Sequence, residues 1–404
     1  MLRTMRTVIV SSRRRFLSLL GVTALLPLAA CGETRGASEA STDDTTLKVV
    51  GSTTQVCDYA TRIAEAASGV ALTRTGADGS VETLGADPAS ASVHVALTCL
   101  LAPNASAHEH EMTAAQSRAL AEADLFLVSG VDLEHFLDDA VSATGFKGRM
   151  VVTSGVLGAV DVDDLDSEVD KEKGLPYTVD RGSGAVDVAP WPFPPEDGEG
   201  QPEFRFDPHV WTSPRNASVQ AANVGRALEA AAPAGAEALR TGVDAYQRLL
   251  DLLDQWVRDS IATVPEKSRV LFTSHDAFGY FSKEYGVRFE GAALSDFNAQ
   301  QDATAQKIQE TVDAVRASGA VAIFAENSNN PKSIQKVADL AGVRAVIGDE
   351  ALYGDSLGAP GSDGETYVGS ILHNVTNLVV AWGGTAAELP EDLRPWAPTD
   401  VVEP

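Results

Sequence analysis

Three histidines and one aspartate in this sequence have the types and placement that a transition-metal site needs. His108 lies in a loop after a predicted strand, His275 ends another, and Asp355 lies in a turn after a third. His209 comes just after the segment 161–206, which is rich in acidic residues, Gly and Pro. Ligands bind near the ends of strands in open α/β sheets, and three imidazoles with one carboxylate suit a divalent transition metal. Long stretches of sequence separate the four residues, so spacing alone leaves open that each is an ordinary solvated side chain.

Several catalytic and nucleotide-binding patterns are missing from the sequence. It contains no GxxxxGK[ST] phosphate loop, no HExxH helix and no CxxC pair. The formal net charge of −26 argues against nucleic-acid binding, because phosphate backbones are held by Lys and Arg. We therefore expect neither a P-loop enzyme nor a nucleic-acid-binding protein.

The N-terminus has the pattern of an export signal over residues 1–30. Basic residues precede an apolar run, Phe16–Ala30, that is too short and too interrupted to span a membrane. The segment Ser-Arg-Arg-Arg-Phe-Leu at 12–17 looks like a twin-arginine motif, and Leu-Ala-Ala-Cys-Gly looks like a lipobox that attaches lipid to Cys31. A cytoplasmic protein with a chance cysteine is the alternative. We expect an extracytoplasmic protein anchored by lipid to the outer face of the cell membrane.

The segment after this signal is small, polar and without apolar periodicity. Residues 31–46 therefore predict a flexible tether, since such a segment cannot bury enough apolar surface to fold. All charged residues of the signal are basic, so its removal moves the formal net charge of the chain from −26 to −31. Two cysteines, Cys57 and Cys99, remain beside the lipidated one, and outside the cytoplasm such a pair tends to form a disulfide.

The body of the chain alternates short apolar runs with helical periodicity, which predicts βαβ units and parallel sheets. The predicted strands are 47–51, 93–101, 125–129 and 150–153 in the first half, and 269–273, 287–292, 320–325 and 343–347 in the second. The fold class is α/β, with an N-terminal lobe at 47–235, a linking helix at 236–264, a C-terminal lobe at 265–383 and a tail at 384–404.

The linking helix has the clearest pattern in the chain. Apolar residues recur at Val243, Tyr246, Leu250 and Leu253 with the spacing of one helical face, and Pro265 ends the run. A helix of this length spans more than one small domain. We therefore predict two α/β lobes joined by one long helix.

Two segments differ in composition from the rest of the body. Residues 161–206 are rich in acidic residues, Gly and Pro, and predict a solvated surface insertion, with a disordered linker as the alternative. Residues 384–404 are also rich in Pro and acidic residues and predict a loose tail.

The segments around the four candidate ligands resemble the metal-binding receptor lipoproteins of zinc/manganese ABC importers. APNASAHEHEMT resembles the segment that supplies this family's first ligand, and DPHVW, SHDAFGYF and GDSLG resemble the next three in the same order. The similarity extends over about residues 47–382. It implies two lobes joined by a rigid helix, with His108, His209, His275 and Asp355 binding the metal in the cleft between them.

The resemblance also implies a function without catalysis. A member of this family captures a divalent metal and delivers it to the permease and ATPase of an ABC importer, and we expect a monomer. Manganese-selective members commonly carry a carboxylate at the position of His275. An imidazole there favours Zn²⁺ over Mn²⁺ as the cargo, because nitrogen ligands suit zinc better than manganese.

Two further residues could assist the site. His110 replaces the aromatic residue usual in the family and could be an auxiliary ligand, and Glu326 could orient a ligand imidazole. Two other functions stay open at this point. A zinc hydrolase of the cell envelope would keep one coordination position open for water, and a surface adhesin or structural protein could use the same fold.

Overall fold

The computed structural model describes residues 46–193, 202, 204–292 and 305–403. The predicted export signal, the lipid-attachment residue Cys31 and nearly all of the predicted tether lie outside the described residues. Among the helices that are described, none combines the length and the apolar character that crossing a membrane requires.

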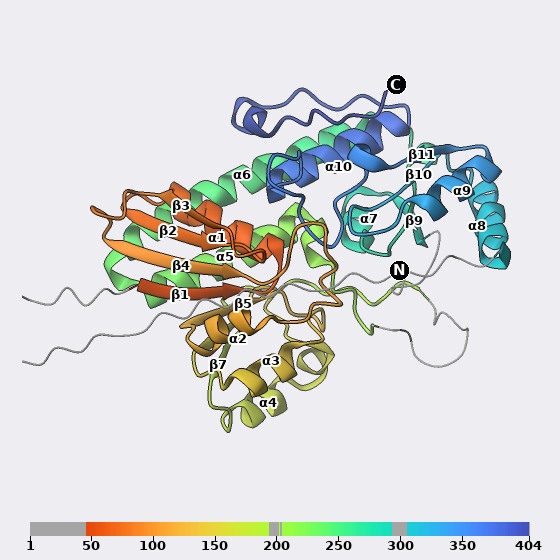
Figure 1. Cartoon of the computed structure of the whole chain (residues 1–404). Helices are drawn as coiled ribbons and strands as arrows, with labels where there is room; N and C mark the ends of the chain where they lie inside the picture. The colour runs from red at the N-terminus through yellow and green to blue at the C-terminus, as the bar shows by residue number, and fades with distance from the viewer. Residues whose placement is uncertain (1–45, 194–201, 203, 293–304, 404) are drawn as a thin grey trace, which may run out of the picture. The chain divides into compact units, whose positions relative to one another are not determined.

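The first half of the body is built on one sheet of seven strands (Figure 1). Its strands in chain order are β1 (Thr46–Gly51), β2 (Val70–Thr75), β3 (Val81–Gly85), β4 (Val93–Cys99), β5 (Leu125–Val128), β6 (Arg149–Val152) and β7 (Thr178–Asp180). Their spatial order is β3-β2-β4-β1-β5-β6-β7, and every pair is parallel except the β2–β3 hairpin. The carboxyl ends of the parallel strands therefore lie along one edge.

Helices cover both faces of this sheet. They are α1 (Thr54–Ala66), α2 (Ala114–Ala121), α3 (Leu137–Thr144), α4 (Ala159–Glu172) and α5 (Pro214–Ala231). Val49 of β1 belongs to the buried cluster that contains α1 and α5, and its neighbour Val50 belongs to the cluster that contains α2 and α3. Successive side chains of a strand point to opposite faces, so the second half of β1 is buried on both sides, whereas Lys48 in its first half is exposed.

The second half has shorter parallel strands. They are β8 (Val270–Thr273), β9 (Arg288–Ala292), β10 (Ala322–Phe324) and β11 (Arg344–Val346), with helices α7 (Gly279–Tyr285), α8 (Ala305–Ser318), α9 (Lys332–Ala341) and α10 (Tyr367–Ala381). β8 pairs with β9 and β10 pairs with β11, both in parallel, and β10 lies beside β8. The predicted α/β class is confirmed.

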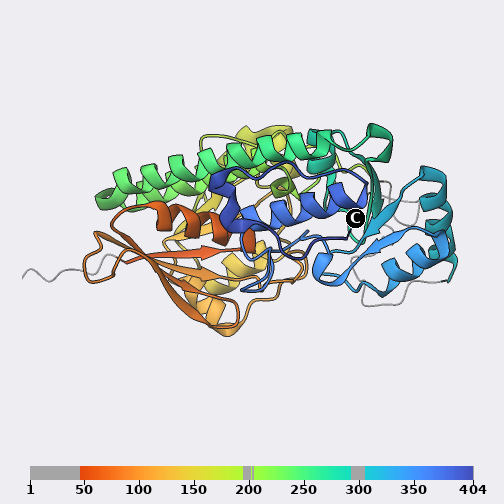
Figure 2. The same ribbon diagram turned by 90° about the horizontal axis from the view of Figure 1, so that it is seen from above.

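The long helix α6 (Ala236–Ala262) connects these two halves (Figure 2). It packs against α1 and α5 of the first half and against α10 of the second. The approach to α5 is close, since a Cβ on Gly225 would lie 2.0 Å from Cγ2 of Val243. One buried cluster includes Leu250 and Leu253 of α6 together with residues from both halves. The helix thus joins the two halves through a shared core.

The acidic segment 161–206 is more ordered than its composition predicts. Its first part forms most of α4, and β7 adds an edge strand to the sheet. Arg181 makes half-buried ion pairs with Asp161 and Glu172, which place one positive charge between two carboxylates of the helix. This part therefore forms a helix and an edge strand rather than a loop, but it lies at the surface as predicted, since no residue of α4 is buried. Residues 194–201 and 203 lie outside the described residues.

The prediction that residues 384–404 form a loose tail is wrong. Leu393 and Val402 are buried in the main core, and the indole N–H of Trp256 donates a hydrogen bond to the carbonyl of Ala387 at 3.0 Å. The Asn377 side chain of α10 accepts from the Val402 N–H at 2.9 Å. Two isolated apolar residues and these hydrogen bonds therefore attach the segment to the core, although its composition predicts a solvent-exposed chain.

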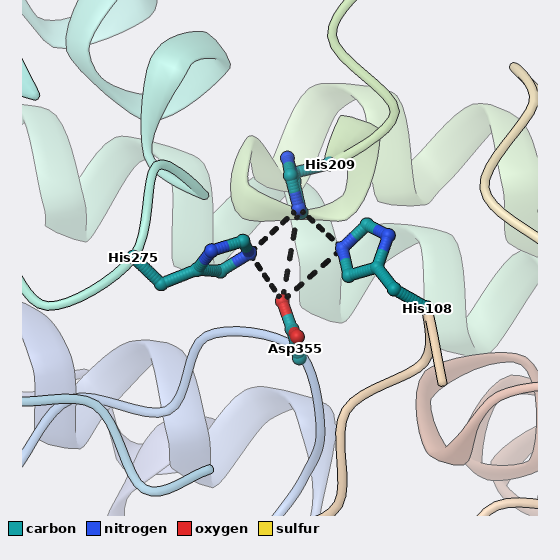
Figure 3. A group of neighbouring side chains, drawn as sticks. All are labelled: His108, His209, His275 and Asp355. Carbon is teal, nitrogen blue, oxygen red and sulfur yellow. Dashed lines mark hydrogen bonds and ion pairs between the residues drawn. The ribbon is translucent and has the colours of Figure 1, made fainter. Parts of the chain in front are cut away.

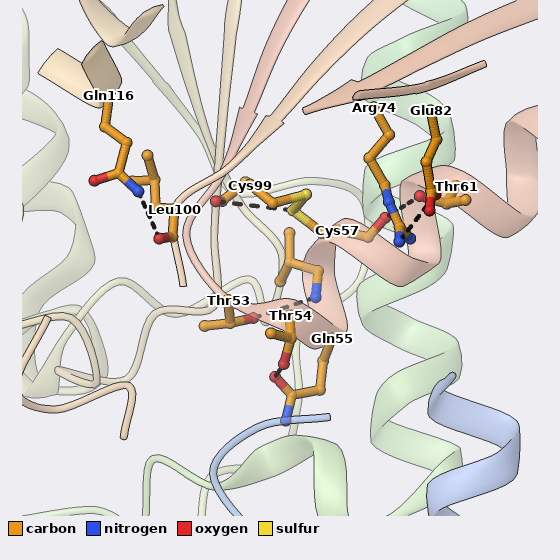
Figure 4. Close-up of a disulfide and its surroundings, with 12 residues drawn as sticks. Thr53, Thr54, Gln55, Cys57, Thr61, Arg74, Glu82, Cys99, Leu100 and Gln116 are labelled. Carbon is orange, nitrogen blue, oxygen red and sulfur yellow. Dashed lines mark hydrogen bonds and ion pairs between the residues drawn. A yellow bond between two sulfur atoms is a disulfide. The ribbon is translucent and has the colours of Figure 1, made fainter. Parts of the chain in front are cut away.

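Cys57 and Cys99 form a disulfide between α1 and the end of β4 (Figure 4). Their Cα atoms are 6.0 Å apart, which is in the usual range for a disulfide. The predicted pairing is present in the structure. It ties the start of the loop that carries His108 to the first turns of α1.

Candidate metal centre

The four predicted ligands come together at one point (Figure 3). One donor atom from each of His108, His209, His275 and Asp355 lies within 4.8 Å of the other three. Nε2 of His209 is 3.1 Å from Nε2 of His108 and 3.1 Å from Nε2 of His275. Oδ1 of Asp355 is 3.0 Å from His275 Nε2, 3.7 Å from His209 Nε2 and 3.8 Å from His108 Nε2.

These separations fit one tetrahedral ion. In a four-coordinate site with metal–ligand bonds of about 2.0–2.1 Å, neighbouring donor atoms are roughly 3.3 Å apart. The residues are also shielded from water, with exposed fractions of 0% for His209, 2% for Asp355, 6% for His275 and 7% for His108. The cluster can therefore enclose a dehydrated cation with four protein donors.

The ligands are positioned by loops at the ends of strands. His108 lies between β4 and α2, and His275 follows β8. His209 directly precedes a single 3-10 turn, Val210–Thr212, that leads into α5. Asp355 follows the bridge that pairs Glu326 with Leu352 beyond β11. Both halves of the body thus contribute ligands.

A second carboxylate orients His209. Oδ1 of Asp207 lies 2.8 Å from Nδ1 of His209 and also accepts from its main-chain N–H at 3.0 Å. A carboxylate on the far nitrogen fixes the tautomer and leaves Nε2 free for a metal. Sequence reasoning missed Asp207, although a carboxylate two positions before a candidate ligand is visible in the Asp-Pro-His segment.

The loop of Asp355 is attached to the first half of the chain. Ser106 donates a hydrogen bond to Oδ2 of Asp355 at 2.8 Å, which leaves Oδ1 facing the imidazoles. The Gln55 side chain of α1 donates to the Asp355 carbonyl at 3.1 Å, and the Trp211 indole donates to the Gly354 carbonyl at 3.0 Å. These bonds hold the two halves of the site in register.

The electrostatics of the cluster are those of a cation site. Burial, the largest single influence, lowers the pKa of His275, but the carboxylate of Asp355 together with Glu326 and Asp276 outweighs burial and raises this pKa to about 10. Burial lowers the pKa of His108 well below its usual value. Burial alone would raise the pKa of Asp355, but the facing imidazoles hold it well below its usual range. The carboxylate is therefore available as an anionic ligand.

The two auxiliary candidates are placed differently from the ligands. Oε1 of Glu326 accepts from the main-chain N–H of His275 at 3.1 Å, and burial raises the pKa of Glu326 well above its usual value. Glu326 thus fixes the backbone of that loop, and its predicted contact with an imidazole stays a prediction. His110 is outside the four-residue group, and its ring packs on Phe136 with centroids 5.1 Å apart.

Comparison with known proteins identifies the family of the chain. Residues 49–381 match the family described as "Zinc-uptake complex component A periplasmic". The chain is 31% identical over 291 residues to the manganese-binding lipoprotein MntA of Bacillus subtilis, which covers 71% of this chain and 83% of that protein. It is 30% identical over 296 residues to the zinc-binding protein TroA of Treponema pallidum, which covers 72% of this chain and 83% of TroA.

A weaker relative and a solved structure extend this result. The iron-binding protein YfeA of Yersinia pestis is 26% identical over 281 residues, covering 70% of this chain and 77% of YfeA. The structure of the periplasmic zinc-binding protein TroA from Treponema pallidum superposes with a TM-score of 0.59 at 26% identity, covering 83% of this chain and 99% of that one. The chain belongs to the family of zinc-uptake complex component A, whose members are metal-binding receptors of importers and not enzymes.

Proposed function

We propose that this protein captures Zn²⁺ outside the cytoplasm and delivers it to the permease and ATPase of an ABC importer. The observation that carries the proposal is the buried group of three imidazoles and one carboxylate at tetrahedral spacing. Nitrogen-rich, four-coordinate sites suit zinc, whereas manganese favours oxygen ligands and octahedral geometry.

The choice of metal rests on this donor set and not on the relatives. Their names divide between manganese for MntA, zinc for TroA and iron for YfeA. His275 supports zinc, since it supplies a third imidazole where a carboxylate would favour a harder cation. Mn²⁺ is the competing cargo.

The site also supports a receptor over a hydrolase. Catalytic zinc keeps one coordination position open for water, whereas four protein donors at these separations complete a tetrahedral shell. We further propose that the mature protein is a monomer anchored to the membrane through lipid on Cys31, as its lipobox predicts. MntA, one of its relatives, is named a lipoprotein.

Competition between the two metals tests the proposal. The mature protein is stripped with a chelator, and its affinities for Zn²⁺ and Mn²⁺ are measured by calorimetry with the competing ion present. We expect one bound zinc ion that manganese does not displace at equal concentration. Replacement of His94, which lies in β4 outside the cluster, by alanine should leave zinc binding unchanged. Preferential retention of manganese would contradict the assignment of zinc, and failure to bind either ion would contradict the receptor function.

A further inference from the structure

Two stretches of the acidic segment form an arm next to the metal ligands. We call residues 186–193 and 204–206 the aromatic arm. Its two sides pair in antiparallel fashion at Pro190 and Phe206. The N–H of Trp191 donates to the Arg205 carbonyl at 3.1 Å, and the N–H of Asp207 donates to the Ala189 carbonyl at 2.9 Å. Asp207 and Pro208 connect the arm to the candidate ligand His209.

Rings of the aromatic arm lie against the imidazoles of two ligands. The centroid of Phe204 is 5.5 Å from that of His108, and the centroid of Trp191 is 6.2 Å from that of His209. Trp191 and Phe204 contact each other edge to face, with centroids 5.4 Å apart. Phe204 also stacks on His135 at 5.6 Å. Two connected rings therefore cover this side of the site with apolar surface.

The aromatic arm also contacts the second half of the body. Phe193 packs on Phe289 of β9 with centroids 5.3 Å apart. A Cβ on Gly291 would lie 2.7 Å from Cε1 of Phe193, so this contact requires glycine. The Tyr280 hydroxyl accepts from the Ala189 N–H at 3.0 Å and donates to the Asp207 carbonyl at 2.9 Å. The arm thus reaches from the first sheet to β9 and α7, across the ligands.

A delivered ion has to leave this enclosure. The loops of His209 and Asp355 are fixed by buried hydrogen bonds, and their displacement would break the ligand set itself. The aromatic arm is held by ring contacts, by the hydrogen bonds given above and by an ion pair of Arg205 with Asp163 in which both side chains are about half exposed. None of the arm's residues is among the four candidate ligands, so its contacts can break without removing a donor atom from the site. The arm can therefore move while the ligands stay in place.

We propose that Trp191 and Phe204 form a hydrophobic cover that limits the rates at which the metal ion enters and leaves the site. This proposal rests on the proposed receptor function. It gives Trp191 and Phe204 a role in metal exchange without direct binding of the metal. A cover slows both rates by a similar factor. It therefore changes the rate constants much more than the dissociation constant.

The test measures both rates in the mature protein. Zinc release into excess chelator and zinc uptake are followed by stopped flow for wild type and for Trp191→Ala, with Phe204→Ala as a second variant. We expect release and uptake to accelerate by about tenfold each, which corresponds to ~1.4 kcal/mol in each barrier, while the dissociation constant changes by less than about threefold. Trp191→Phe keeps a ring over His209 and should restore rates close to those of wild type.

A matched control removes a tryptophan elsewhere. Trp396, which is partly exposed in the C-terminal segment, is replaced by alanine and should leave both rates unchanged. The absorption spectrum of bound Co²⁺ reports whether each variant keeps a four-coordinate site. If the rates of Trp191→Ala equal those of the control, the proposed cover is contradicted. Faster release without faster uptake would also contradict it, because this result indicates that a metal ligand has been displaced. Failure of the wild-type protein to bind zinc would instead overturn the receptor function on which the cover rests.

Discussion

The metal ligands and the aromatic arm lie side by side but are held by different kinds of contact. Buried hydrogen bonds fix the candidate ligands and their loops, such as Asp207 on His209 and Gln55 on the carbonyl of Asp355. The arm is attached mainly through rings, among them Trp191 and Phe204. Buried polar bonds are directional and costly to break, whereas ring contacts tolerate displacement. We infer from this difference that the four candidate ligands set the affinity for metal and the arm sets the speed of exchange.

Removal of a ligand should have the largest effect. Four ligands in structural zinc sites share about 10–16 kcal/mol of binding free energy, so His209→Ala should cost roughly 3 kcal/mol, which is about a hundredfold in Kd. Competition with a chelator of known affinity measures this loss. An affinity within about threefold of wild type would show that His209 is not a ligand.

The pH dependence should be the next largest effect. Because Asp355 raises the pKa of His275 to about 10, His275 carries a proton at pH 7 that zinc must displace. Zinc affinity should therefore rise by about tenfold per pH unit from pH 7 toward pH 9 and fall below pH 7. Calorimetry in buffers of different ionisation enthalpy should detect about one proton released per zinc bound at pH 7. An affinity independent of pH across this range would contradict the predicted proton exchange.

Loss of the charge on Asp207 should have a smaller effect on affinity. Substitutions of carboxylates that orient a ligand histidine typically cost 10–100-fold in metal affinity, and Asp207→Asn keeps an acceptor for Nδ1 of His209. We expect about a tenfold weaker affinity, with one zinc ion still bound. Zinc titration measures both quantities, and an unchanged affinity would remove Asp207 from the site.

The exposed ion pair of the arm should have the smallest effect. Surface ion pairs contribute about 0–1 kcal/mol, so Asp163→Asn should speed zinc release by about twofold and leave Kd unchanged. Asp166→Asn removes the same charge from an exposed position of α4 and serves as the control. A change in Kd without a change in release rate would show that the arm contributes to affinity, which would contradict the proposal that it controls only the exchange rates.

Local patterns in the sequence predict much of the fold. The apolar spacing from Val243 to Leu253 predicts α6 because a buried helical face repeats with the period of the helix itself. Thr113 and Gln116 predict the start of α2, and both capping-box bonds are present. The residues of the metal centre are also predicted, since each lies in a distinctive segment of the family.

The arm and the tail could not be predicted in the same way. Trp191 and Phe204 stand among prolines and acidic residues, and nothing local distinguishes a ring that covers an imidazole from a ring in a solvated loop. Leu393 and Val402 are single apolar residues without periodicity, and their burial depends on the surface that α6 and α10 present. Tertiary contacts of this kind are absent from local patterns.

X-ray absorption at the zinc edge tests the central claim most directly. The mature protein is loaded with one equivalent of Zn²⁺ at neutral pH, and its spectrum is compared with that of His209→Ala. We predict a four-coordinate ion with imidazole nitrogen and carboxylate oxygen at about 2.0–2.1 Å, with the imidazole contribution reduced in the variant. A five- or six-coordinate shell dominated by oxygen, or a spectrum that the substitution leaves unchanged, would contradict the site described here.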